Sequence, residues 1–318
     1  MEYNTTIENL KETLEKYGVA VIPNILTNEE INEMKSGMWA TLGKITSKFK
    51  NPIKEKNKKS WASFYDLHPL HSMLLQHWQV GQAQFVWDLR QKESVIQPFM
   101  KIWDCKAEDL LVSFDGLSVH FPPEDTGLGW YKNKDWLHTD QSYTRNNFEC
   151  VQSFVSGYDI NEGDATLTFL EGSHKYHKDF AEHFGKQDQS DWNKISSDEE
   201  LKFYLDKGCK RCNIQCSAGS MVFWDSRTIH AGQEAKEERK RKNTRLVVYI
   251  CLTPRQLADE VTLAIKRKAF EEMRMTSHWP HKIKLFPIHP KPYGKKLPEV
   301  TNLPKPNLTE LGKKLAGF

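Results

Sequence analysis

Residues 110–121 have the sequence LLVSFDGLSVHF, and they open the part of the chain that decides its fold. Short runs of β-branched and aromatic residues recur after them, separated by Gly, Pro, Asp and Asn, a pattern typical of strands joined by turns. Because these runs follow a helical first third, they predict an antiparallel double sheet closed as a jelly roll with helices packed on it. The expected strands are 110–121, 150–158, 166–170, 220–224 and 245–252.

The N-terminus is predicted to enter this core as helix, strand and helix. A capping box at Thr5 and Glu8 opens the first helix, ahead of apolar residues at helical spacing. A short buried strand follows at 19–22, and a second capping box at Thr27 and Glu30 opens the next helix.

Residues 1–275 are predicted to form a single domain, with a helical support over 1–104 and a jelly-roll core over 105–254. Within the support, the lysine-rich run 44–60 is interpreted as a solvated loop. Residues 61–104 are rich in Trp, Leu, Gln and Phe and are predicted to be helical and buried.

The second half contains three further features. Residues 175–210 are polar and are interpreted as an insertion in the core, partly helical at 198–205. A C-terminal helix is predicted over 255–275, with Leu257, Val261 and Ile265 on one face. Residues 276–318 hold half of the 14 prolines and are expected to form an extended basic arm.

Composition excludes several classes of protein. A hydrophobic content of 38% is ample for a packed core, and 45 basic against 42 acidic residues give no polyanion-binding footprint. The polar start lacks a signal-peptide core, no stretch approaches a membrane span, and the last residues are not a peroxisomal signal. With six cysteines expected to be reduced, the sequence predicts a cytoplasmic protein that does not associate with membranes.

The motif WLHTD at 136–140 contains His138 and Asp140. On a strand, side chains i and i+2 point to the same face, so the imidazole and the carboxylate would converge. A third ligand, His230, ends the sequence WDSRTIH after a strongly apolar run. Two imidazoles and one carboxylate on one face of a metal leave positions open, as in non-haem Fe(II) oxygenases. His-x-Asp alone also arises by chance in many proteins.

Four segments, in the same order, resemble the phytanoyl-CoA dioxygenase family of Fe(II)/2-oxoglutarate oxygenases. They are YGVAVIPNILTNEE at 17–30, WLHTDQ at 136–141, DATLTFLEGSHK at 164–175, and AGSMVFW leading to IHAG at 218–232. The resemblance covers about residues 5–252. It implies a double-stranded β-helix enzyme that holds Fe(II) through His138, Asp140 and His230 and uses 2-oxoglutarate and O2.

The resemblance also assigns Arg245 to the far carboxylate of 2-oxoglutarate. A guanidinium offers a planar fork to a carboxylate and stays charged when buried. Arg245 opens an apolar strand, where its charge would be costly without an anionic partner. The gap from His230 to Arg245 is longer than is usual in the family. Arg239 and Arg241 are the alternatives for this role, and they lie in a charged run interpreted as a solvated loop.

Three further residues are candidate contacts of 2-oxoglutarate. Gln152 and Phe154 alternate on one face of the expected strand 150–158, and Phe154 matches the position of an aromatic that the family places beside the cosubstrate. His120, on the strand before the metal motif, falls near another such contact. For Phe154 and His120, ordinary core packing is an equally good interpretation.

The implied reaction is hydroxylation of a C–H bond, with formation of succinate and CO2. The presence of Asp140 argues against halogenation, which needs the carboxylate's place for chloride. A small molecule or acyl derivative is the expected substrate, and polar residues flanking the iron motifs would line an entrance for an anionic or polar molecule. These are Lys132, Lys134, Tyr143, Arg145 and Arg227.

Several alternatives remain open at this point. The basic arm is the only support for a protein side chain or a nucleobase as substrate. A non-catalytic jelly-roll binding protein or a cupin-like isomerase or hydrolase would not need Arg245. Cys209, Cys212 and Cys216 have spacing that suggests zinc, but no fourth ligand follows. The cluster TSHWP at 276–280 could cap the mouth of the barrel. The sequence does not predict the oligomeric state.

Overall fold

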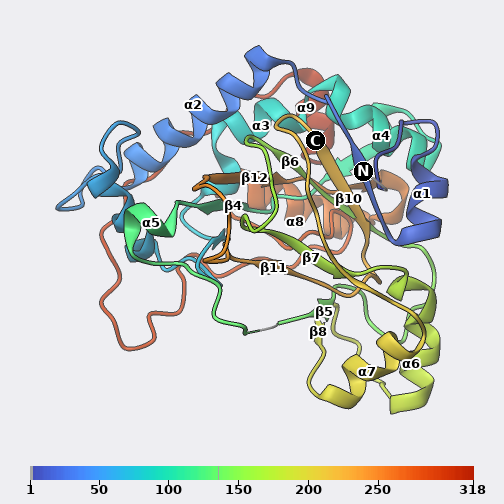
Figure 1. The fold of residues 1–318 in the computed structure, drawn as a ribbon. Coiled ribbons are helices and arrows are strands. Elements are labelled where there is room, and N and C mark those ends of the chain that lie inside the picture. The colour runs from blue at the N-terminus through green and yellow to red at the C-terminus, as the bar shows by residue number, and fades with distance from the viewer. Residues whose placement is uncertain (1–2, 135) are drawn as a thin grey trace.

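The computed structural model describes residues 3–134 and 136–318. It consists mostly of antiparallel sheets with helices around them, as predicted (Figure 1). The strands are β1 Val19–Ile22, β2 Leu74–Leu75, β3 Leu110–Val112, β4 Leu117–His120, β5 His138–Thr139, β6 Val151–Ser156, β7 Thr166–Leu170, β8 Asn193–Lys194, β9 Arg211–Asn213, β10 Met221–Asp225, β11 His230–Gln233, β12 Arg245–Tyr249 and β13 Leu252–Pro254.

These strands form two larger sheets. A six-stranded sheet has the order β1-β10-β6-β12-β4-β2, and a five-stranded sheet has the order β8-β5-β11-β7-β9. The remaining pair, β13 and β3, forms a separate ribbon. Every strand-to-strand pairing in these sheets is antiparallel among the described residues.

Strand β12 shows how the two faces of the larger sheet are used. Leu246 and Val248 belong to the main hydrophobic cluster, which they share with the helices. Val247 belongs to a second cluster, which it shares with Leu167 and Phe169 of the smaller sheet. Because side chains alternate along a strand, Arg245 and Tyr249 lie on the same face as Val247, between the two sheets.

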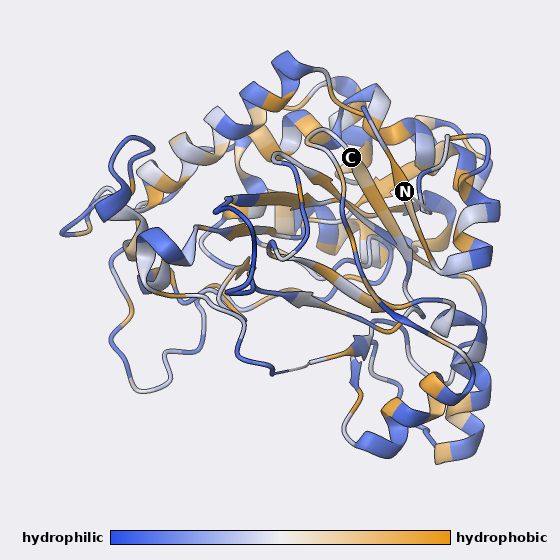
Figure 2. Ribbon diagram, in the orientation of Figure 1, coloured by the Kyte–Doolittle hydropathy of each residue, from blue (hydrophilic) through white to orange (hydrophobic). Residues whose placement is uncertain are grey.

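The helices are α1 Leu10–Tyr17, α2 Asn28–Ile45, α3 Gln84–Arg90, α4 Glu93–Trp103, α5 Pro123–Thr126, α6 His177–Phe184, α7 Asp198–Asp206, α8 Glu260–Glu271 and α9 Glu310–Leu315. Helices α2, α3, α4 and α9 lie over the larger sheet, whereas α6 and α7 lie beside the smaller one (Figure 1). The strands of the larger sheet are mostly apolar, while the exposed sides of the helices are mostly hydrophilic (Figure 2). None of the helices in the described ranges is long and apolar enough to span a membrane.

The N-terminal prediction is confirmed except at its first cap. Thr27 and Glu30 form the predicted capping box of α2. Helix α1, however, begins at Leu10 after Asn9, so the predicted box at Thr5 and Glu8 is wrong. The backbone N–H of Thr5 donates to the carbonyl of Val21 at 2.9 Å, which commits this segment to the edge of β1 instead of a helix.

The C-terminal predictions need two corrections. Helix α8 starts at Glu260, so Leu257 precedes it. The predicted apolar stripe of Leu257, Val261 and Ile265 is exposed. The helix packs through another face, with Leu263, Lys266, Ala269 and Phe270. The arm over 276–318 is not extended throughout. It ends in α9, where Leu315 and Ala316 are fully buried in the main hydrophobic cluster.

The segment 175–210 is helical at 198–206, as predicted, and also contains α6 and the short strand β8. Strand β8 pairs with β5 through His138 and Lys194, so this segment borders the predicted metal motif. The aromatic residues of α6 and α7 pack on Leu137, Ile229 and Ala231, which come from the outer face of the smaller sheet and the residues beside it.

Candidate metal centre

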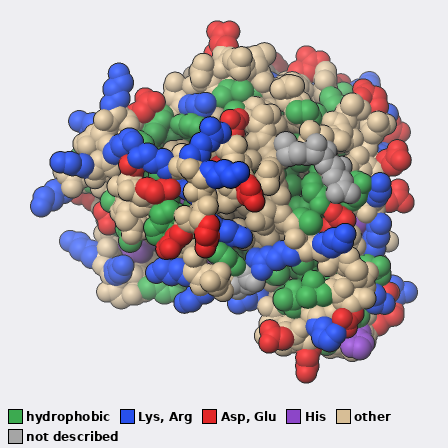
Figure 3. Space-filling view, in the orientation of Figure 1, with side chains coloured by type: hydrophobic (Ala, Val, Ile, Leu, Met, Phe, Trp, Pro, Cys, Tyr) green, Lys and Arg blue, Asp and Glu red, His purple; other side chains and the backbone are tan. Residues whose placement is uncertain are grey.

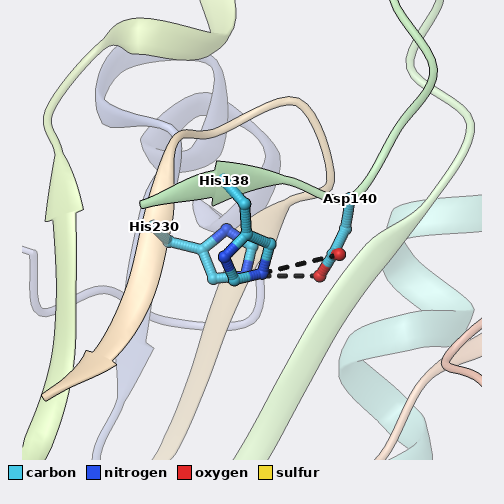
Figure 4. Close-up of side chains that lie close together, drawn as sticks. All are labelled: His138, Asp140 and His230. Carbon is cyan, nitrogen blue, oxygen red and sulfur yellow. Dashed lines mark ion pairs between the residues drawn. The ribbon is translucent and has the colours of Figure 1, made fainter. Parts of the chain in front are cut away.

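The three predicted ligands meet on the smaller sheet. His138 begins β5, His230 begins β11, and the two residues are directly paired across these antiparallel strands. Asp140 follows β5 by one residue, as the i, i+2 spacing predicted. One ligand atom from each of the three lies within 4.8 Å of the others, and the side chains point toward one another (Figure 4).

Backbone carbonyls orient both imidazoles. Nδ1 of His138 lies 2.9 Å from the carbonyl of Trp136, and Nδ1 of His230 lies 2.9 Å from the carbonyl of Thr228. A carbonyl can only accept, so each Nδ1 carries the proton and donates it. In the neutral rings, the lone pairs on Nε2 are then left free, which is the usual way in which a protein presents histidine to a metal.

This donor set fits a divalent cation. Nε2 of His230 lies 3.3 Å from Oδ2 of Asp140, and Nε2 of His138 lies 3.6 Å from Oδ1. Three acceptors converge here in a buried site, an arrangement that is unfavourable unless a cation lies between them. Two imidazoles and a carboxylate form the ligand set of the facial triad, which suits Fe(II).

The charges of the site favour metal-binding forms. Burial raises the pKa of Asp140, but the nearby histidines His138 and His278 outweigh it, so its pKa lies well below the usual value. Burial, followed by the neighbouring His138, lowers the pKa of His230. Both shifts keep the ligands deprotonated near neutral pH, as coordination requires.

Gln152 lies next to the metal ligands. Its Nε2 donates to Oδ2 of Asp140 at 2.9 Å, and the residue also lines the cavity at the centre. Gln152 was predicted to contact 2-oxoglutarate. Within the protein, its side chain contacts the carboxylate of the metal ligand Asp140. This contact fixes the orientation of Asp140, a role that the alternation along the strand did not indicate.

Arg245 lies between the sheets and is only 4% exposed. Its Nη1 donates to the carbonyl of Ala165 at 3.2 Å, and its guanidinium lies 5.2 Å from the ring centre of Phe154. Among the described residues, no carboxylate lies within 4.0 Å of it. A buried guanidinium without an anionic partner fits the far carboxylate of 2-oxoglutarate.

The alternative arginines are less suitable. Arg239 donates to both Glu124 and Asp164, and its side chain is only 1% exposed, although the charged run around it is mostly exposed, as predicted. Its carboxylate partners already balance its charge. Arg241 is exposed.

His120 is directly opposite Arg245 in the pairing of β4 with β12. Its Nε2 lies 2.8 Å from the carbonyl of Gly129. Burial lowers the pKa of His120 to about 4. These contacts support core packing as the role of His120, in preference to a contact with 2-oxoglutarate.

A cavity of about 440 Å³ opens beside the three ligands. Its walls are rich in aromatic rings, and several polar residues face it that sequence reasoning did not select. The lining includes Leu70, Leu74, Gln76, Asp115, Trp136, Leu167, Trp192, Trp224, Tyr249, Ser277, His278, Trp279, Lys282, Lys284 and Phe286. The cluster TSHWP was the one sequence signal for this wall, and its Ser277, His278 and Trp279 line the cavity.

The polar residues expected at the entrance lie elsewhere. Arg145 pairs with Glu149 and Asp191, and Arg227 pairs with Asp225. Tyr143 is buried against His177 and Phe180. None of these three lines the cavity, nor do Lys132 and Lys134, which border a separate hollow.

The cysteine alternative finds no support in the described part of the chain. The one cluster there with metal-ligating geometry is that of His138, Asp140 and His230. Cys209 and Cys216 are buried and Cys212 is partly buried, without forming such a group.

The three side chains match the ligand set that non-haem iron enzymes use, and they lie on one of two antiparallel sheets. The family model described as phytanoyl-CoA dioxygenase (PhyH) matches residues 14–243, and the chain belongs to this family. This membership confirms the predicted resemblance. Fe(II) and 2-oxoglutarate are the cofactors of the family, and the ligand set of His138, Asp140 and His230 fits them.

A curated relative is the Ava biosynthesis cluster protein O of Aspergillus versicolor, which is 27% identical over 213 residues. The match covers 65% of this chain and 66% of that protein, just under two thirds of its length.

Two solved structures share the fold. The hypothetical protein JW0805 of Escherichia coli has a TM-score of 0.61 at 15% identity, over 99% of this chain and 85% of its own. The product of GlcNAc Inducible Gene 2 of Candida albicans has a TM-score of 0.52 at 12% identity, over 85% of this chain and 70% of its own. At these identities the likeness concerns the fold alone.

Proposed function

We propose that this chain is an Fe(II)- and 2-oxoglutarate-dependent dioxygenase, built on a jelly-roll core, that hydroxylates a C–H bond of a small molecule. The observation that carries the proposal is the convergence of His138, Asp140 and His230 at the wall of a cavity. Between the same two sheets lies a buried arginine that has no carboxylate partner in the described structure. Membership of the phytanoyl-CoA dioxygenase family supports it.

His138, Asp140 and His230 would hold the iron. Iron held there would supply, with 2-oxoglutarate and O2, the oxidation of a C–H bond, with succinate and CO2 as coproducts. The carboxylate of Asp140 occupies the position that a halogenating enzyme would need for chloride, which favours hydroxylation.

Arg245 would bind the far carboxylate of 2-oxoglutarate. Burial makes this ion pair stronger than it would be in water, and no competing carboxylate lies near in the described structure. The carbonyl of Ala165 and the ring of Phe154 hold the guanidinium in place. Phe154, Val247 and Leu167 belong to the apolar cluster around it, which excludes water from the cosubstrate.

The cavity supports a small substrate. About 440 Å³ is at the lower end of the size of small-molecule sites, and its walls combine apolar rings with a few polar groups. The face shown in Figure 3 gives no corresponding support for nucleic acid, because basic and acidic side chains are intermixed on it.

The role of Arg245 can be tested by binding. We would measure 2-oxoglutarate binding by calorimetry to protein loaded with Mn(II), which keeps the site from turning over. Arg245→Gln is expected to weaken binding by about tenfold or more, the loss typical of a charge-assisted hydrogen bond. The exposed Arg241→Gln is the matched control and should bind as the wild type does. Equal affinity in all three proteins would exclude Arg245 as the carboxylate-binding residue.

A further inference from the structure

A second buried carboxyl group, that of Asp115, faces the cavity. The residue lies between β3 and β4 and is 7% exposed. Its Oδ1 accepts a hydrogen bond from the backbone N–H of Gly116 at 2.6 Å. In the described structure this is the one hydrogen bond that the carboxyl makes, and no cationic side chain lies within 4.0 Å of it. Asp115 therefore has acceptor capacity that the protein does not use.

The backbone around Asp115 is held firmly. Nη2 of the fully buried Arg90 donates to the carbonyl of Asp115 at 2.8 Å, so this cation contacts the main chain instead of the carboxyl. A Cβ on Gly81 would collide with the same carbonyl, and a Cβ on Gly116 would collide with the carbonyl of Leu75. The carboxyl is thus fixed before any ligand arrives, which lowers the entropic cost of binding.

The segment 276–279 is docked beside Asp115. The backbone N–H of Phe114 donates to Oγ1 of Thr276, and the N–H of Thr276 donates to the carbonyl of Phe114, both at 3.0 Å. This places Ser277, His278 and Trp279 on the same wall. Oγ of Ser277, Nε2 of His278 and Nε1 of Trp279 are buried and have no hydrogen-bond partner in the described structure.

Unpaired buried polar atoms are costly, so a wall that carries several of them is suited to a polar ligand. The iron would be held by His138, Asp140 and His230, and 2-oxoglutarate by Arg245, so these groups remain for the primary substrate. Trp192, in the segment between α6 and α7, adds an indole that is 49% exposed, with its ring centre 5.8 Å from that of His138.

We propose that Asp115 is the polar anchor of the primary substrate, and that this substrate carries an amine or another basic N–H group on a flat aromatic body. The inference rests on the proposed function, because it takes the cavity beside the metal centre as the substrate site. A buried carboxyl prefers a charged N–H donor over a neutral hydroxyl. The exposed face of Trp192 supplies a stacking surface for the ring.

The electrostatics around Asp115 agree with this assignment. Burial raises the pKa of Asp115, and the approach of a cation would offset that cost of ionisation. His278 and Arg90 act in the opposite direction, while Asp140 adds to the rise. At the rim, Lys282 pairs with Glu149, and Lys284 is exposed. These lysines disfavour a second positive charge on the substrate, so we expect Asp115 to bind a substrate with a single amine.

The test compares three indoles that differ at one end of the molecule. Tryptamine carries an ammonium group, tryptophol a hydroxyl, and indole-3-propionate a carboxylate. Each is titrated by calorimetry into anaerobic protein that is saturated with Fe(II) and 2-oxoglutarate. The visible band of the iron-bound oxoacid is followed in the same samples. Tryptamine is expected to bind at least tenfold more tightly than the other two, and Asp115→Asn should remove this preference while the band is retained.

Asp115→Asn keeps the shape of the side chain and an oxygen for the N–H of Gly116, and the exposed Asp66→Asn is the control. All titrations are repeated without metal and 2-oxoglutarate. If the preference for tryptamine persists but no band forms, Asp115 is supported as the substrate anchor and the proposed oxygenase function is contradicted. The role of Asp115 is contradicted if the band is normal and the wild type shows no preference for tryptamine. It is also contradicted if Asp115→Asn shows the same preference as the wild type.

Discussion

Nε2 of His230 lies 3.3 Å from Oδ2 of Asp140, in a buried site where the Nδ1 atoms of His230 and His138 both face backbone carbonyls. The protein therefore directs three acceptors at one point. Such a cluster is unstable by itself and becomes stable when a cation occupies it. The metal chemistry of this chain follows from that relationship.

Replacing Asp140 with Asn should separate metal binding from folding. Without metal, Asp140→Asn is expected to melt at the same temperature as the wild type or higher, because a negative charge facing two lone pairs is removed. Added Mn(II) should raise the melting temperature of the wild type only. Thermal unfolding with and without the ion measures both effects. If Mn(II) raised the melting temperature of Asp140→Asn as much as that of the wild type, Asp140 would be excluded as a metal ligand.

Gln152 should control metal affinity through Asp140. Gln152→Leu removes the 2.9 Å hydrogen bond to Oδ2 of Asp140 without touching a ligand. Loss of such a supporting contact typically weakens metal binding by about tenfold to a hundredfold. Competition for Mn(II) with a coloured chelator gives the dissociation constant. Wild-type affinity in this variant would show that Asp140 needs no support from β6.

His120 should make the stability of the metal-free protein depend on pH. Burial lowers its pKa from 6.5 to about 4, so the folded state binds fewer protons than the unfolded state between these values. Stability is therefore lost as the pH falls from 6.5 toward 4, by about 3 kcal/mol for a shift of this size. Urea unfolding of His120→Gln across this range should show a flatter profile, and the exposed His183→Gln should not. If His120→Gln also abolished 2-oxoglutarate binding, the packing role assigned to His120 would be wrong.

Lys266 should be replaceable at no cost to stability. It is fully buried, donates to the carbonyl of Val112 and lies 4.1 Å from the ring centre of Phe114. Burial holds its pKa well below 10.5, so the unfolded state binds more protons and the penalty shrinks as the pH rises toward 10.5. Lys266→Met should be as stable as the wild type at pH 7 or more stable, with a weaker dependence on pH. A loss of several kcal/mol in chemical denaturation would contradict this.

The sequence predicted the parts of the site that depend on local geometry. His138 and Asp140 share a strand face because of their spacing, and an apolar run carries His230 to the neighbouring position. Strand β7 has the predicted bounds, 166–170, because turn residues delimit it. The stretch 110–121 is divided into β3 and β4, because its middle leaves the sheet and carries Asp115 to the cavity.

What the sequence did not predict depends on contacts between distant segments. Asp115 faces the cavity because Arg90 and Thr276 hold the main chain on either side of it. Trp192 reaches the metal centre because β8 pairs with β5. Helix α9 lies in a proline-rich stretch, and Leu315 becomes buried only when the rest of the core exists. No pattern within one segment indicates such pairings.

The most direct test of the account is optical. Fe(II) and 2-oxoglutarate are added to the purified protein without oxygen, and the weak visible band of an iron-bound oxoacid is recorded for the wild type and for Asp140→Asn. We expect a band that needs both additions and is absent in the variant. A wild-type protein that demonstrably holds iron and still shows no band on addition of 2-oxoglutarate would contradict it.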